Sequence, residues 1–111
     1  MSIVNMRAQF VKTTTDLMEA DSKVCLLLGD IGVHGFRNVL KEYPNRSFNI
    51  GILEQATIGM AAGLAAMDMV PIVHTIAPFI VERAYEQLKI DFGYQNLGGN
   101  FVSVGASYDY A

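Results

Sequence analysis

Short apolar runs alternate with helical stretches along this chain, and that alternation limits the possible folds more than any other feature. Val24–Leu28 is a continuous apolar run closed by Gly29, as expected for a parallel strand that is covered on both faces. Ser47–Gly51, Pro71–Ile76 and Phe101–Val104 are further strand candidates. Strands that alternate with helices predict an α/β fold, a doubly wound and mainly parallel sheet with helices on both faces.

Helices are predicted before and between these strands. Met6, Phe10, Leu17 and Met18 recur near helical spacing and predict an amphipathic first helix with one packed face. The third helix is rich in Ala, Met and Leu, and its small residues allow another backbone to approach closely. The predicted helices span residues 5–20, Arg37–Glu42, Glu54–Met67 and Pro78–Ile90, with a turn at Gly98–Gly99 before the last strand.

The residues that could take part in binding or catalysis cluster where the predicted strands end. Gly29–Asp30, Gly51–Glu54 and His74–Phe79 each follow or close a strand. Parallel sheets of this kind bind ligands in the crevice beyond the carboxyl ends of their strands. The sequence therefore predicts a site at this edge.

Composition narrows the class of protein. The 111 residues are 51% hydrophobic, enough for one domain over residues 1–111 with a buried core. The net charge is −3 and the eight Lys and Arg residues are scattered, so nucleic acid is not an expected partner. Cys25 is the only cysteine, which leaves no disulfide and no cysteine-based metal site to propose.

Targeting signals are not apparent. Residues 1–16 contain no apolar core of the kind found in signal peptides, so a cytoplasmic protein is expected. The longest nearly uncharged stretch, Ala56–Met67, is shorter than the roughly 20 apolar residues that cross a bilayer. No membrane span is predicted.

The segment from Phe48 to Ala65 resembles the pyrimidine-binding domain of transketolases, deoxyxylulose-phosphate synthases and 2-oxo-acid dehydrogenase beta chains. It joins a strand, the pair Glu54–Gln55 and a helix containing Ala-Ala-Gly-Leu-Ala, in the family's order and spacing. Pro71-Ile-Val is similar to the next strand, and Arg83–Gln87 to the helix after it in the synthases. The likeness covers residues from about 5 to 106.

The resemblance implies a thiamine diphosphate enzyme in which Glu54 is catalytic and binds the cofactor. The family's matching glutamate hydrogen-bonds the ring nitrogen of the cofactor's aminopyrimidine and favours the imino form that activates the cofactor. From the residues alone, Glu54 is also explained as an acidic residue in the first turn of a helix.

Two further positions follow from the resemblance. Phe79 matches the aromatic residue that stacks on the aminopyrimidine, although it could equally be a core residue of its helix. Counting forward from Pro71 gives Phe79, whereas counting back from Arg83 gives Ile80, so the match needs one inserted residue. Arg83 matches an arginine near the substrate, where it could hold a sugar phosphate, but an exposed helical arginine explains it as well.

The remaining candidates are weaker. Asp30 matches an acidic position common at this strand end in the wider family, which makes it a candidate for cofactor binding, and a turn aspartate is the simpler explanation. His34, in a glycine-rich loop, and His74, at a strand end, are candidates for substrate contact.

The family's diphosphate and metal motif, Gly-Asp-Gly followed by asparagines, has no counterpart in the chain. The resemblance therefore implies that magnesium and the diphosphate are held by the diphosphate-domain subunit of a split transketolase, in a homodimer or hetero-oligomer. Family domains continue into a Gly-x-Thr-His segment, so a truncated domain is expected.

Three hypotheses stay open at this point. The first is a subunit of a ketol transferase that is inactive without its partner. The second is a non-catalytic remnant that oligomerises or binds. The third, an unrelated receiver or flavodoxin-like domain, lacks the acidic cluster or hydroxyl-rich loop that it would need.

Overall fold

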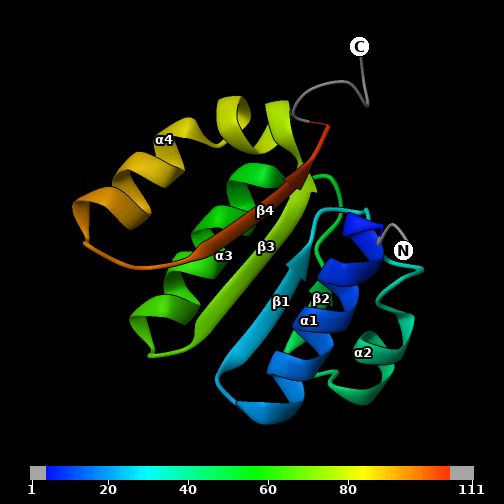
Figure 1. Ribbon diagram of the computed structural model, residues 1–111. Helices are drawn as coiled ribbons and strands as arrows, with labels where there is room; N and C mark the ends of the chain where they lie inside the picture. Colours follow the sequence, from blue (N-terminus) through cyan, green and yellow to red (C-terminus); the bar gives the residue numbers. More distant parts are fainter. Residues whose placement is uncertain (1–4, 106–111) are drawn as a thin grey trace.

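The computed structural model describes residues 5–105, which form a four-stranded parallel sheet in the order β2-β1-β3-β4 (Figure 1). The central register aligns Leu28 of β1 with Asn49 of β2 and His74 of β3. The predicted α/β fold with a parallel sheet is confirmed. The strands are β1 Val24–Leu28, β2 Ser47–Asn49, β3 Val70–Ile76 and β4 Asn100–Val104.

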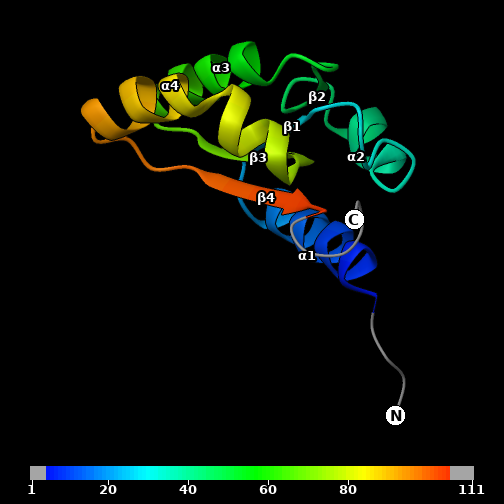
Figure 2. The same ribbon diagram turned by 90° about the horizontal axis from the view of Figure 1, so that it is seen from above.

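Helices cover both faces of this sheet, as predicted (Figure 2). On one face lie α1, Met6–Ala20, and α2, Arg37–Glu42. On the other lie α3, Glu54–Ala66, and a helical stretch made of η1, α4 and η2. The bounds of that stretch are Phe79–Arg83 for η1, Tyr85–Gln87 for α4 and Leu88–Tyr94 for η2. Within residues 5–105, no helix has the length and apolar character needed to span a membrane.

Strand β1 divides its side chains between two core layers because successive residues of a strand point to opposite faces. Cys25 and Leu27 pack with Ile58 of α3, whereas Leu26 and Leu28 pack with the α1 and α2 layer. All five residues of β1 are buried. This explains why the strand is apolar throughout rather than alternating.

The buried face of α1 differs from the prediction. Thr14 and Met18 are buried and Phe10 is half-buried, whereas Met6 is 80% exposed and Leu17 is 46% exposed. Residues four positions apart on a helix differ by about 40° around its axis. Met6 lies three such steps before Met18, so its side chain points about 120° away from that of Met18. Leu17 is one position from Met18 and therefore about 100° around the helix.

Three boundaries also differ from the prediction by two residues or more. β2 ends at Asn49 rather than Gly51, because Gly51 has φ +93° and turns the chain away from the strand. The turn before β4 falls at Gln95–Asn96, where Asn96 has φ +54°, rather than at Gly98–Gly99. The last helical stretch continues past Ile90 to Tyr94.

Candidate functional site

Glu54 is a buried carboxylate at the carboxyl edge of the sheet. It is the first residue of α3, and the positive-φ turn at Gly51 brings the chain from β2 to this helix. The Glu54 side chain is only 3% exposed, whereas Ile52 and Leu53 beside it are 66% and 57% exposed. The chain therefore turns its acidic side chain inward and two apolar side chains outward.

Arg83 is the partner of this carboxylate. Its Nη1 donates a hydrogen bond to Oε1 of Glu54 at 3.0 Å. The same guanidinium lies over the ring of Phe79, with Cζ 4.1 Å from the ring centroid. The Arg83 side chain is 54% exposed, so a solvent-facing cation links a buried carboxylate to an aromatic ring.

The structure separates Phe79 from Ile80, which sequence counting left as alternatives. Ile80 is 4% exposed and packs in the core with Val73 and Ala84, whereas Phe79 is half-buried beside Arg83. Both lie in η1, whose wide turns are of the π type. A π-type turn accommodates one extra residue in a helix. The inserted residue that sequence counting required therefore coincides with this turn.

A cleft of about 330 Å³ opens beside Glu54. This volume lies within the range of roughly 300 to 1,000 Å³ typical of small-molecule sites. The cleft is lined by Ile52, Leu53, Glu54, Gln55, Ala56 and Arg83. A carboxylate shielded from water at an apolar rim can accept a hydrogen bond from the N–H of a flat heterocycle.

The end of β1 passes close to β3 near this cleft. A Cβ atom on Gly29 would lie 2.7 Å from Oγ1 of Thr75, so only glycine fits the crossing. Gly29, Glu54 and Thr75 border the same narrow gap, which is too small to hold a water molecule. The glycine that closes the first strand in the sequence therefore has a packing role beside Glu54.

Asp30 and His34 lie on loops. Asp30 is exposed, has φ +60°, and exchanges two hydrogen bonds with Asn49, whose Oδ1 accepts from the Asp30 backbone N–H at 2.9 Å. These bonds tie the end of β1 to the end of β2, which is a sufficient structural role for Asp30. His34 is exposed on the loop before α2, and its carbonyl accepts a hydrogen bond from Arg37 at 2.7 Å.

His74 lies on the opposite face of the sheet from Glu54. It is 5% exposed, its ring packs against Phe10 at 4.7 Å between centroids, and Nδ1 lies 2.7 Å from the carbonyl oxygen of Val102. Burial lowers the pKa of His74, and the nearby Arg7 lowers it further, against the opposing effect of the bond to Val102. The neutral ring therefore donates from Nδ1 to that carbonyl.

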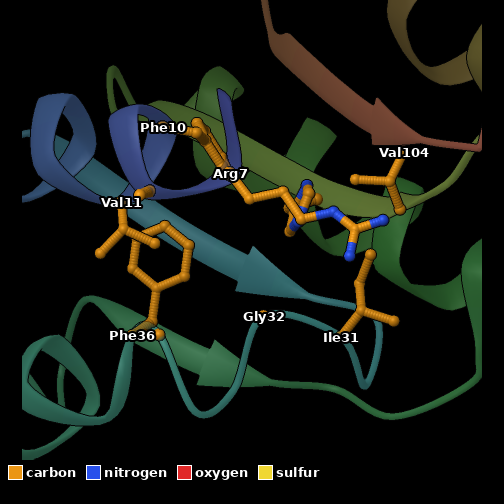
Figure 3. A pocket seen from close by; sticks show the side chains of 10 residues that line it. Arg7, Phe10, Val11, Ile31, Gly32, Phe36 and Val104 are labelled. Carbon is orange, nitrogen blue, oxygen red and sulfur yellow. The ribbon is translucent and has the colours of Figure 1, made fainter. Parts of the chain in front are cut away.

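A second cavity, of about 310 Å³, lies on this face (Figure 3). It is bounded by α1, by the loop before α2 and by His74, and Figure 3 shows Arg7 reaching across it toward Ile31 and Val104. Sequence reasoning missed this cavity because its walls come from separate segments with no common motif. The expectation that His74 and Glu54 face one crevice is wrong, because β3 presents His74 to the α1 side.

Comparison with known proteins identifies the family. A sequence model described as the pyrimidine-binding domain of transketolase matches residues 2–111. The chain belongs to this family. Its members depend on thiamine diphosphate, and the resemblance inferred from residues 48–65 is confirmed.

The relatives are longer proteins. An uncharacterised 33.6 kDa protein in the fasciation locus of Rhodococcoides fascians is 45% identical over 105 residues, which cover 95% of this chain and 34% of that protein. One subunit of the apulose-4-phosphate transketolase of Actinobacillus succinogenes is 44% identical over 71 residues, 62% of this chain and 23% of that subunit. The 1-deoxy-D-xylulose-5-phosphate synthase of Exiguobacterium sibiricum is 37% identical over 91 residues, 81% of this chain and 14% of the synthase.

A solved structure confirms the fold. A split-gene transketolase, described as an inactive beta4 tetramer, superimposes with a TM-score of 0.81 at 28% identity. The match covers 92% of this chain and 34% of that chain. This chain therefore spans about a third or less of the length of the relatives named above.

Proposed function

We propose that this chain supplies the pyrimidine side of a thiamine diphosphate site in a split, transketolase-like enzyme that transfers a ketol unit between sugar phosphates. The observation that carries the proposal is the buried Glu54 carboxylate beside an open cleft, with an exposed arginine as its partner. The similarity to a protein named as one subunit of a transketolase supports an enzyme built from separate chains.

The residues of the site suit the aminopyrimidine half of the cofactor. Glu54 would accept a hydrogen bond from the ring nitrogen in its protonated form, and its burial would keep water from competing for that bond. Phe79 would stack on one face of the ring, and the exposed Ile52 and Leu53 would exclude water once a partner covers them. When bound, thiamine diphosphate supplies the electron sink for breaking a carbon–carbon bond beside a ketone.

The diphosphate and magnesium require a second subunit in this proposal. Among residues 5–105, no three His, Cys, Asp or Glu side chains are grouped so that they could hold a metal ion. Magnesium is held by oxygen ligands, which a diphosphate-domain subunit would provide. Arg83, with its planar fork, is the candidate on this chain for the phosphate of the sugar substrate.

The test is a calorimetric titration of thiamine diphosphate with magnesium into this chain, alone and mixed with the diphosphate-domain subunit of a split transketolase. We expect binding in the mixture, weakened about 10- to 100-fold by Glu54→Ala because a charged hydrogen bond is lost. Glu42→Ala, the same substitution at an exposed position in α2, is the matched control. Circular dichroism checks that both variants fold, and equal affinity for Glu54→Ala and the parent would refute the assignment.

A non-catalytic, oligomerising domain is the second candidate. The similar solved structure is described as an inactive tetramer of beta subunits, which favours self-association without turnover. In that case sedimentation would show oligomers of this chain, and no diphosphate-domain subunit would restore ketol transfer. Restored turnover in a reconstituted complex would eliminate this candidate.

A further inference from the structure

We propose that Arg83 competes with the cofactor's aminopyrimidine ring for Glu54 and Phe79, so that its displacement sets the affinity for the cofactor. This inference rests on the proposed function above. An aminopyrimidine protonated at its ring nitrogen can donate that N–H to a carboxylate and stack on an aromatic face. The guanidinium of Arg83 already makes both contacts, at 3.0 Å to Glu54 and 4.1 Å to the Phe79 ring.

The chemistry of the two groups explains the competition. A guanidinium is planar, donates several N–H bonds in its plane and stacks on aromatic rings, as does a protonated aminopyrimidine. Two planar groups cannot occupy the same face of Phe79 at stacking distance. The cofactor ring can therefore reach that face only when Arg83 leaves it.

The structure allows Arg83 to leave without disturbing the core. Its side chain is 54% exposed, while its neighbour Ala84 is fully buried and Ile80, three residues earlier, is 4% exposed. The backbone of η1 is thus anchored from within, and only the side chain has to rotate toward solvent. An exchange of partners also keeps the buried carboxylate of Glu54 hydrogen-bonded throughout, which avoids the cost of an unpaired buried charge.

Substitutions at Arg83 test this competition. Arg83→Met keeps the length of the side chain but removes the planar cation, and Arg83→Lys keeps the charge without the plane. Glu82→Gln, an exposed neighbour, is the control. In titrations of thiamine diphosphate with magnesium into the complex with a diphosphate-domain subunit, we expect Kd to fall about 5- to 10-fold for Arg83→Met and less for Arg83→Lys. Should the methionine variant fail to fold, the lysine variant alone carries the test.

A second readout follows the arginine itself. The Nε–Hε resonance of Arg83, assigned by its loss in Arg83→Lys, should move toward the shift of a solvated arginine when cofactor is added to the complex. Weaker or unchanged cofactor binding in both variants would overturn the competition. If Glu54→Ala also leaves binding unchanged, the proposed function fails as well; if Glu54→Ala abolishes binding, only the role of Arg83 is refuted.

Discussion

The two faces of the sheet each bury one ionisable side chain near the same edge, yet they differ in how that group is held. Glu54, on the α3 face, is paired with the half-exposed side chain of Arg83. His74, on the α1 face, is bonded to the carbonyl of Val102 and packed against Phe10. A side-chain partner can be exchanged for a ligand, whereas a backbone partner within the sheet cannot move alone.

Cavity volume does not separate the two faces. The clefts measure about 330 Å³ beside Glu54 and about 310 Å³ beside His74. The cleft on the His74 side has an aromatic wall, in which Phe10 and Phe36 are in edge-to-face contact at 5.4 Å. The two faces therefore differ in the partner of the buried group rather than in cleft volume or in burial.

The largest effect should come from removing core side chains on either face. Leu27→Ala and Leu28→Ala, which are adjacent in β1 and both fully buried, should each lower the free energy of unfolding by about 2 to 5 kcal/mol. Leu17→Ala, at a 46% exposed position, is the control and should cost much less. Urea titration measures all three, and a cost below about 1 kcal/mol for either buried leucine would show that its face is not a packed layer.

An intermediate effect should come from the protonation of His74, which makes the stability of the folded chain depend on pH. The folded chain holds the pKa of His74 below its usual value, so the unfolded chain binds a proton more readily. Stability should therefore be complete above about pH 7 and fall as pH drops through the unfolded pKa near 6.5. His74→Asn keeps a donor for Val102 but does not titrate, and should remove this slope.

Urea midpoints between pH 7.5 and 5 measure that slope. His34→Asn, at an exposed position, should retain it. Glu54→Gln should retain it as well, because Glu54 lies on the other face. A slope that survives His74→Asn would show that another group carries the pH dependence.

The smallest effect should come from an exposed ion pair. Nζ of Lys23 lies 2.5 Å from Oδ2 of Asp68, and the two side chains are 53% and 86% exposed. Such exposed pairs contribute at most about 1 kcal/mol to the free energy of unfolding. Lys23→Ala should therefore lower the free energy of unfolding by less than about 1 kcal/mol, and 0.5 M salt should remove most of that loss. A larger loss that resists salt would show that the Lys23–Asp68 pair behaves like the partly buried Glu54–Arg83 pair and not like an exposed ion pair.

Local sequence features predicted much of the fold. The apolar run at Val24–Leu28, the proline-terminated α2 and the start of α3 at Glu54 all match the structure, because strand burial and helix ends depend on nearby residues. The family could also be inferred from one contiguous segment, residues 48–65, since its strand, acidic residue and helix adjoin in the chain.

Tertiary structure alone decided which candidate residues meet. Glu54 and Arg83 are 29 residues apart in the sequence and meet through a hydrogen bond. Arg83 lies at the end of η1, whose turns are of the π type, and Ile80 and Ala84 beside it pack in the core. The face to which His74 points depends on the register of β3, which a short apolar run does not reveal. The sequence by itself determined the order of elements and the edge of the sheet at which the candidate residues lie, because those follow from local periodicity. The pairing of side chains across that edge follows only from how the layers pack.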